Sequence, residues 1–144
     1  MKVIITIEVD GENVNVSTET KGSEKDDLWI EPANEYSRVF DETCAGWTND
    51  PKYNLMFITC QQNYANGLLR DKGHLFLNEV FDMFGIPRTK IGQIVGWVYE
   101  AENPIGDNFV DFGIQEEFNA DFVNGNINTA ILNFNVDGNI LDRI

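Results

Sequence analysis

The stretch LNEVFDMFGIPRTKIGQIVGW, residues 77–97, decides between two folds and two kinds of function. Its first eight residues have the apolar periodicity of a short amphipathic helix, which Gly85-Ile86-Pro87 ends. Polar and basic residues follow from Arg88, where the recognition helix of a helix-turn-helix would begin. However, two glycines come next, each costing about 1 kcal/mol relative to alanine inside a helix. Residues 94–100 are rich in β-branched and aromatic residues, so we predict one helical turn over residues 89–93 and then a strand.

The longest predicted helix, residues 52–72, lies upstream of this stretch. Asp50 is a good N-cap, Pro51 suits the first helical position, and Gly73 ends the helix. Apolar side chains recur at intervals of three or four residues, so the helix is expected to be the central core element. The side chains expected to face the core are Tyr53, Phe57, Cys60, Tyr64 and Leu68, with Leu55, Met56, Ile58, Ala65 and Leu69 widening the surface.

The remaining segments predict a small sheet around these helices. Residues 2–18 alternate apolar and polar around Asp10-Gly11, which is typical of a β-hairpin. Residues 33–45 are predicted to form a short helix that carries Tyr36, Val39, Phe40 and Cys44.

At the C-terminal end, residues 108–114 and 129–136 alternate like strands, with a short helix or turn over residues 116–123 between them. Asp137-Gly138 is a second turn signal, and Ile140, Leu141 and Ile144 are expected to pack the terminus. The order of hairpin, helices and antiparallel meander predicts an α+β fold. We expect one domain over residues 1–144, with a core over 32–144 and the hairpin and loop of residues 1–30 as a variable addition.

Composition narrows the class of protein. The chain has 144 residues, of which 42% are hydrophobic, so most of it is expected to fold around a real core. No apolar run approaches the roughly 18 residues of a membrane span, and the first residues lack a signal-peptide pattern. Two cysteines without a CxxC motif and one histidine argue against a zinc site. We therefore expect a cytoplasmic protein with reduced cysteines.

Charge is the strongest global signal, with a formal net value of −14. Residues 1–50 hold 12 acids and 4 bases, and residues 101–144 hold 8 acids and 1 base. The middle, residues 51–100, holds 4 acids and 5 bases, so a nearly neutral centre lies between two acidic flanks. A DNA-binding surface normally carries a basic footprint, because each phosphate contact neutralises a charge. Direct binding of nucleic acid is therefore disfavoured.

No catalytic, cofactor-binding or metal-binding residues are predicted. The segment from Asn133 begins like a calcium-binding EF-hand loop, but its twelfth position is Ile144 where glutamate is needed, so a strand and turn explain it better. His74 follows the long helix, where it suits the negative end of the helix dipole. Pairs such as Glu116-Glu117 are expected to be solvated.

Several blocks from residue 36 onward share a pattern: YSRVFDETCAGW, NLMFITCQQNYAN, GHLFLNEVFDMFGIPRTKIGQIVGW, NPIGDNFVDFG and FNVDGNI. Together they resemble a family of small uncharacterised proteins from Firmicutes, their phages and their integrative elements. The resemblance covers about three quarters of the chain and leaves out residues 1–30. It implies a bacterial cytosol and a mobile-element context, and it supplies no activity.

Three functions remain open. The first is a non-enzymatic factor that binds another protein, such as a CRISPR nuclease, by imitating DNA with its carboxylates. The candidate residues are Asp26, Asp27, Asp41, Glu42, Asp107, Asp111, Glu116, Glu117 and Asp121. The second is sequence-specific DNA binding through residues 77–93, with Arg88, Thr89, Lys90 and Gln93 as readers. The third is an enzyme of unknown type. Exposed aromatic residues are also compatible with a homodimer.

Overall fold

The structure is a computed structural model that describes residues 35–144. The predicted hairpin over residues 2–18 lies outside the described residues, as do Asp26 and Asp27. The chain divides into two units, residues 1–39 and residues 40–144. In the first unit, the described residues form a local turn in which the Arg38 guanidinium donates to the carbonyls of Glu35 and Ser37. The second unit contains the helices and most of the strands.

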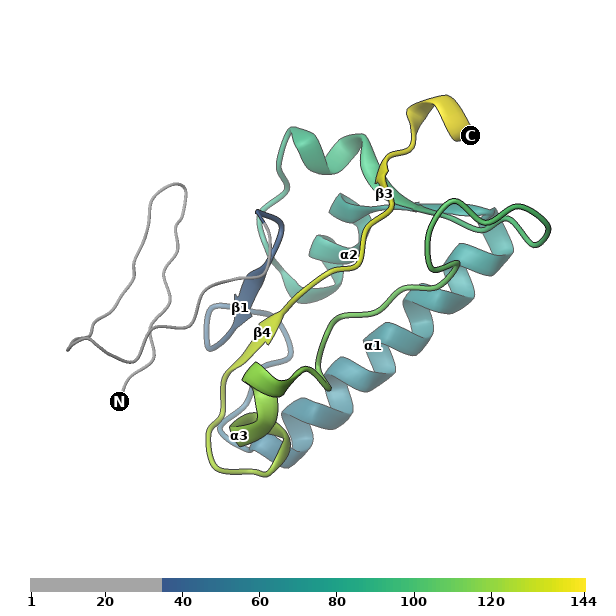
Figure 1. Ribbon diagram of the computed structural model, residues 1–144. Helices are drawn as coiled ribbons and strands as arrows, with labels where there is room; N and C mark the ends of the chain where they lie inside the picture. Colours follow the sequence, from purple (N-terminus) through teal and green to yellow (C-terminus); the bar gives the residue numbers. More distant parts are fainter. Residues whose placement is uncertain (1–34) are drawn as a thin grey trace. The chain divides into compact units, whose positions relative to one another are not determined.

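The described part of the chain is α+β, as the sequence predicted, with three α-helices and two small sheets (Figure 1). One sheet has the order β2-β3-β5 and the other consists of β1 and β4. The helices are α1 (Pro51–Lys72), α2 (Leu77–Phe84) and α3 (Ala120–Val123). The strands are β1 (Arg38–Phe40), β2 (His74–Phe76), β3 (Val95–Val98), β4 (Ala130–Leu132) and β5 (Gly138–Asn139). Three 3₁₀ turns complete the set: η1 (Ile91–Gln93), η2 (Glu117–Asn119) and η3 (Leu141–Arg143).

Helix α1 begins and ends where the sequence predicted. The Asp50 carboxylate accepts hydrogen bonds from the backbone N–H groups of Lys52, at 3.0 Å, and Tyr53, at 3.4 Å. Gly73 ends the helix in the left-handed conformation, with φ of 84°, and donates its N–H to the carbonyl of Leu69. These two caps satisfy backbone groups that a helix terminus leaves unpaired.

The buried face of α1 differs from the predicted one. The side chains that are buried are Asn54, Ile58, Ala65 and Leu69, of which the sequence pattern included the last three. Tyr53, Cys60 and Tyr64, predicted to face the core, are exposed, and so is Met56. The pattern misled because apolar residues occupy both sides of α1, so the period alone does not say which side packs.

The stretch that follows α1 forms β2, α2, η1 and β3, and the prediction of one helix, a single further turn and a strand is confirmed. β2 and β3 pair in antiparallel register, with His74 opposite Val98 and Phe76 opposite Gly96. A Cβ atom at Gly96 would lie 2.0 Å from the carbonyl oxygen of Leu75. The glycine that disfavoured a second helix in the sequence therefore lets the two strands approach closely.

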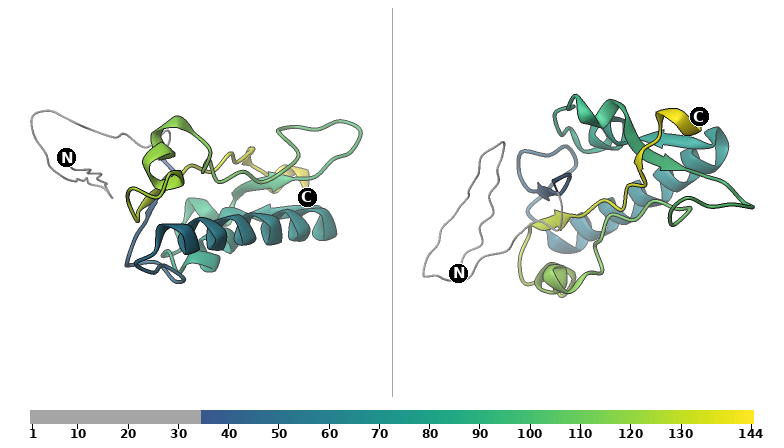
Figure 2. Two further views of the ribbon diagram at one scale, coloured as in Figure 1. Left: turned by 90° about the horizontal axis from the view of Figure 1, so that it is seen from below. Right: turned by 45° about the horizontal axis from the view of Figure 1, so that its top comes forward.

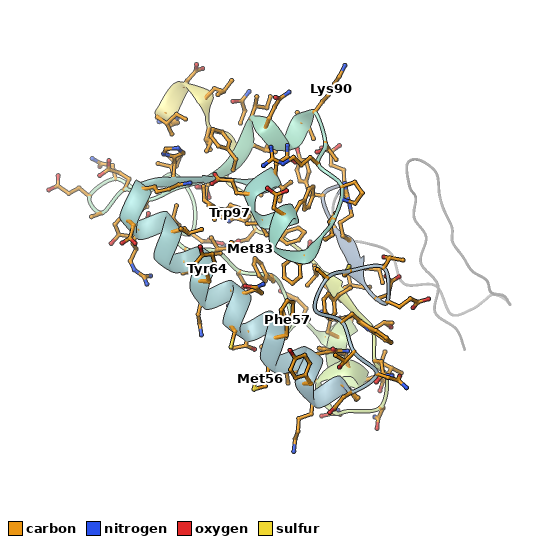
Figure 3. All side chains as sticks on the ribbon, turned by 180° about the vertical axis from the view of Figure 1, so that it is seen from behind. Met56, Phe57, Tyr64, Met83, Lys90 and Trp97 are labelled. Carbon is orange, nitrogen blue, oxygen red and sulfur yellow. The ribbon has the colours of Figure 1, made fainter. Side chains whose placement is uncertain are left out.

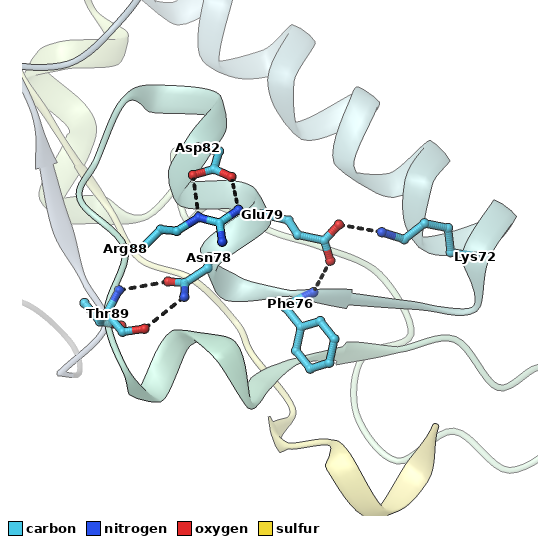
Figure 4. Close-up of polar contacts among 7 residues, drawn as sticks. All are labelled: Lys72, Phe76, Asn78, Glu79, Asp82, Arg88 and Thr89. Carbon is cyan, nitrogen blue, oxygen red and sulfur yellow. Dashed lines mark hydrogen bonds and ion pairs between the residues drawn. The ribbon is translucent and has the colours of Figure 1, made fainter.

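The turn between α2 and η1 is fixed by a pair of side chains (Figure 4). The Asn78 side chain accepts from the N–H of Thr89, at 3.0 Å, and donates to the Thr89 carbonyl, at 2.9 Å. The Thr89 hydroxyl accepts from the N–H of Gly92 and so caps η1. At the start of α2, the Glu79 carboxylate accepts the N–H of Phe76, the backbone half of a capping box. Three polar contacts thus hold the turn between α2 and η1, and a fourth caps the start of α2.

A chain of phenylalanines fills the core between the helices and the C-terminal segment. The rings of Phe40 and Phe84 meet edge to face with centroids 5.8 Å apart, and Phe84 meets Phe112 at 5.4 Å. Phe112 in turn contacts Phe134 at 5.5 Å, and Phe134 contacts Phe81 at 5.7 Å. These five rings come from four separate segments, so the aromatic contacts join parts of the unit that are distant in sequence.

The helix predicted over residues 33–45 is wrong for the residues that the structure describes, which form β1 followed by turns. The Asp41 carboxylate accepts hydrogen bonds from the N–H and hydroxyl of Thr43, at 2.9 and 2.6 Å. This local turn offers the backbone an alternative to a helix, which is why aspartate is favoured in turns.

The C-terminal predictions are confirmed only in part. Residues 116–123 form η2 and α3, as predicted. Of the strand predicted over residues 129–136, only the three residues of β4 form a strand. Residues 108–114 form no strand, so that prediction is wrong. Asp137-Gly138 makes no hairpin turn, because β5 begins at Gly138 and pairs with β3. At the terminus Ile140 is buried, whereas Leu141 and Ile144 are half exposed.

Candidate functional site

The acidic surface of the C-terminal segment is positioned by amide side chains. Asn66 on α1 accepts the N–H of Val110, at 2.7 Å, and donates to the Val110 carbonyl, at 2.9 Å. One turn earlier on α1, the Gln62 side chain accepts the N–H of Phe112 at 2.8 Å. The N–H groups of residues 110–112 therefore all donate to side chains, whereas the carbonyls of Asp111 and Phe112 accept the N–H groups of Asn135 and Asn133. This arrangement explains why the alternation over residues 108–114 produces no sheet.

Asn135 connects two of the predicted acidic residues. Its side-chain oxygen accepts from the indole N–H of Trp97, at 2.8 Å, and from the N–H of Asp111, at 2.7 Å. Its nitrogen donates to the carboxylate of Asp107, at 2.9 Å, and to the carbonyl of Phe109. Asp107 is exposed, whereas Asp111 is half-buried and accepts the N–H of Gly113 through its carboxylate. Asp111 is therefore partly engaged within the protein.

Asp137 is an acid that the list of candidates missed. One carboxylate oxygen accepts the N–H of Val98 at 2.8 Å, and the other is buried without a hydrogen-bond partner among the described residues. Burial raises the pKa of the Asp137 carboxyl, the hydrogen bond from Val98 opposes this rise, and the charge of Asp107 adds to it. Asp137 and Asp107 thus lie near each other, which the sequence spacing did not indicate.

A second acidic group surrounds α3. The carboxylates of Glu116, Glu117 and Asp121 are exposed, and none takes part in an ion pair with another described residue. Buried Asn119 holds this region in place: it donates to the carbonyls of Gly113 and Ile131 and accepts the N–H of Ile131. The group made by these three acids is called the α3 acidic group below.

The structure separates the candidate acids rather than gathering them. The loop that contains Asp107 lies toward the C-terminal end of α1, and α3 lies toward its other end (Figures 1 and 2). Asp41 and Glu42 lie between β1 and α1, where the Asp41 carboxylate serves its own turn and Glu42 is exposed. The described candidates therefore form at least two groups and no single patch.

The alternative DNA-contact residues are partly committed to the fold. The Arg88 guanidinium forms a two-pronged ion pair with Asp82, with distances of 3.1 and 2.6 Å (Figure 4). The hydrogen bond from Arg88 lowers the pKa of Asp82, and the same bond raises the pKa of Arg88. Thr89 is used by the contacts with Asn78 and Gly92. Of the four predicted readers, Lys90 and Gln93 are exposed, and their side chains make no hydrogen bond to residues 35–144 (Figure 3, with Lys90 labelled); a backbone hydrogen bond joins the N–H of Gln93 to the carbonyl of Lys90.

The described residues contain neither a cluster of metal-binding side chains nor a helix suited to crossing a membrane. Across residues 35–144, no three histidine, cysteine, aspartate or glutamate side chains gather closely enough to hold a metal ion. Over the same residues, no helix combines the length and apolar character that crossing a bilayer requires. Cys44 is buried and burial raises the pKa of its thiol, whereas Cys60 is exposed on α1.

Comparison with known proteins gives a family and no activity. A family model described as a family of unknown function (DUF6353) matches residues 5–144. This match extends further toward the N-terminus than the resemblance seen in the sequence, which began at residue 36. Neither a curated protein nor a solved structure matches the chain.

Proposed function

The chain belongs to this family of unknown function, and we propose that it is a small acidic factor of phage or mobile-element type that binds another protein. In this proposal the partner is a basic nucleic-acid-binding protein of the bacterial cytosol, such as a defence nuclease. The carboxylates occupy positions on the partner that otherwise bind phosphates, and the protein itself catalyses no reaction.

The observation that carries this proposal is that the carboxylates of the α3 acidic group are exposed and form no ion pair with another described residue. Within residues 35–144, the two ion pairs between described side chains join Lys72 to Glu79 and Arg88 to Asp82, and both lie on the nearly neutral middle of the chain (Figure 4). Within this part of the chain, the acids of the α3 acidic group have no such neighbours. A carboxylate that is exposed and free of cations is available to a basic partner without first breaking an internal contact.

The separation of the acids also suits an extended partner. The 22 residues of α1 make a helix about 33 Å long, and the two C-terminal acidic groups lie toward its opposite ends. One turn of B-DNA is about 34 Å long. Charges distributed over this length match a long groove on the partner that binds a DNA duplex. They match less well a small pocket that binds a single anion.

The DNA-binding alternative has less support. Its proposed recognition element is the three residues of η1, which follow a helix of eight residues. A recognition helix must present several side chains to the major groove. Here Arg88 is held by Asp82, and Thr89 is held by Asn78, so two of the four proposed readers already have partners.

The test is a pull-down from Firmicute lysate with the tagged chain, at low and high salt, with and without nuclease. We expect a basic nucleic-acid-binding protein that is retained at low salt, survives nuclease treatment and is lost at high salt. Retention that does not change with salt would sink the proposal. Recovery of DNA that is lost on combining Arg88→Ala with Lys90→Ala would support the alternative.

A matched pair of variants locates the contact. Combining Glu116→Gln, Glu117→Gln and Asp121→Asn removes three negative charges from the α3 acidic group. Combining Asp71→Asn, Glu102→Gln and Asp142→Asn removes three exposed charges elsewhere. We expect the first variant to weaken partner binding about 10-fold or more and the second to change it by less than about 3-fold. Equal losses in both variants would mean that only net charge matters.

A further inference from the structure

The dipeptide Asn-Gly occurs twice in the chain, and the fold places the two copies in different environments. Asn66-Gly67 lies in the interior of α1, whereas Asn124-Gly125 forms the turn that follows α3 (Figure 1). In this dipeptide the backbone nitrogen of the glycine can attack the side-chain amide of the asparagine with little obstruction, because glycine has no Cβ atom. The two copies therefore separate the effect of the fold from that of the sequence.

The first copy is held in place by side-chain hydrogen bonds. The side-chain nitrogen of Asn66 donates to the carbonyls of Gln62, at 3.0 Å, and Val110, at 2.9 Å, and its oxygen accepts the N–H of Val110 at 2.7 Å. The nitrogen of Gly67 lies within a helix of 22 residues. To bring this nitrogen to the amide carbon of Asn66, both the helix and the contact with Val110 would have to open. The fold therefore protects Asn66.

The second copy lies in an open turn. Asn124 and Gly125 are exposed, and the Asn124 side chain makes no hydrogen bond to another described residue. Gly125 has a φ of 84°, and a Cβ atom there would have no atom within 4 Å, so the space around its nitrogen is open. One hydrogen bond, from the N–H of Gly125 to the carbonyl of Phe122 at 3.0 Å, holds this nitrogen. The bond closes the end of a helix of four residues, where opening costs little.

From this contrast we propose that Asn124 is a site of spontaneous deamidation in the folded protein, and that the reaction adds a fourth carboxylate to the α3 acidic group. The deprotonated nitrogen of Gly125 attacks Cγ of Asn124, and the new N–Cγ bond closes a succinimide ring. The Cγ–Nδ2 bond breaks, and ammonia leaves with the proton that Gly125 gave up. Water then adds to either carbonyl of the ring and opens it, which yields aspartate or isoaspartate. Each product carries one more negative charge than asparagine.

The new charge extends a row of acids that is already present. Glu117, Asp121 and Asn124 follow one another at spacings of four and three residues along η2 and α3, which places side chains on one face of a helix. A carboxylate at position 124 therefore lies beside that of Asp121. Under the function proposed above, on which this consequence rests, the added charge strengthens binding to a basic partner. The protein then becomes a stronger DNA mimic as it ages.

The test incubates the purified full chain at neutral pH and follows both dipeptides by mass spectrometry after digestion in mild acid. We expect the peptide that contains Asn124 to react at least about 10-fold faster than the one that contains Asn66, because only one hydrogen bond has to open at Gly125. In unfolding concentrations of urea the two rates should become similar. Asn124→Gln should stay unmodified at this position, because its longer side chain closes a larger ring more slowly.

Two results would overturn the modification site. One is a folded chain in which Asn124 stays intact while the unfolded chain reacts there, and the other is equal rates at the two dipeptides in the folded chain. Binding is measured separately, by the lysate pull-down. Asn124→Asp should retain the basic partner to higher salt, whereas Asn63→Asp, which adds the same charge on α1, should not. Equal retention in these two variants would overturn the effect of the new charge on binding. If no basic partner is captured, the proposed function fails, while the mass spectra still decide whether Asn124 is modified.

Discussion

Residues 51–98 satisfy their backbone mainly within helices and strands, whereas residues 99–137 take many backbone partners from side chains. In the first region, α1, α2 and the β2-β3 pair provide repeating hydrogen bonds. Five residues of the second region bond through their N–H or carbonyl groups to asparagine side chains, namely those of Asn119, Asn135 and, from α1, Asn66. The difference teaches that a core of this size does not require regular structure on every side, provided that buried backbone groups find partners.

The comparison predicts that one asparagine in the second region contributes more to the free energy of unfolding than most side chains in the first region do. Asn119→Ala removes three hydrogen bonds in a buried site: the carbonyl and N–H of Ile131 lose this partner, at about 1–3 kcal/mol for each group, whereas the carbonyl of Gly113 keeps the N–H of Glu116. The total loss should be about 3 kcal/mol. Urea unfolding measures this loss. The matched control is Asn124→Ala, exposed in the same region, which should change stability by less than about 0.5 kcal/mol. If Asn119→Ala and Asn124→Ala lowered the free energy of unfolding equally, the backbone contacts of Asn119 would not be what stabilises this region.

Asn66→Ala tests whether the two regions open separately. The variant removes both hydrogen bonds to Val110 and should cost about 2 kcal/mol, while the helical signal of α1 remains. Amide exchange should become faster at residues 110–112 before it does so in β3. Asn63→Ala, exposed on the same helix, makes the same change in helix propensity and serves as the control. If exchange rises equally in β3, the regions unfold as one.

The smallest effect is expected at Asp137, and it depends on pH. Its pKa is raised in the folded protein, so its contribution to stability is complete below the unfolded pKa and is lost as pH rises through the folded value. At neutral pH the buried charge costs free energy, so Asp137→Asn should stabilise the protein there. The gain should vanish below about pH 4, near the ordinary pKa of aspartate. Unfolding curves at several pH values check this, with exposed Asp142→Asn as the control; destabilisation at neutral pH would contradict it.

The same contrast explains what could be predicted from the sequence. Local signals fixed the ends of α1 and α2, since Asp50, Pro51, Gly73 and Gly85 act within one turn of the residues that they cap. The absence of a long second helix after α2 followed from Gly92 and Gly96. These inferences needed no knowledge of distant residues, because each depends on the conformational preference of a residue and its immediate neighbours.

The rest depends on contacts that no local pattern shows. Alternation over residues 108–114 is real, but its partners turned out to be side chains of Gln62 and Asn66, more than 40 residues away. Because α1 has apolar residues on both sides, the sequence pattern did not show which side packs against the core. One signal was available: residues 101–144 contain nine asparagines, which is compatible with a segment held by amide side chains. For the candidate site, composition indicated acidic flanks, while the division into two groups required the fold.

The amide contacts of Asn66 and Gln62 have a consequence for solubility. An extended segment that resembles a strand offers a row of free N–H and carbonyl groups to which a neighbouring molecule can add. Here the N–H and carbonyl of Val110 are occupied by Asn66, the N–H of Phe112 by Gln62, and the carbonyl of Phe112 by the N–H of Asn133. The segment therefore lacks the open edge from which aggregation by strand addition begins, because these partners, most of them side chains of α1, occupy its backbone N–H and carbonyl groups.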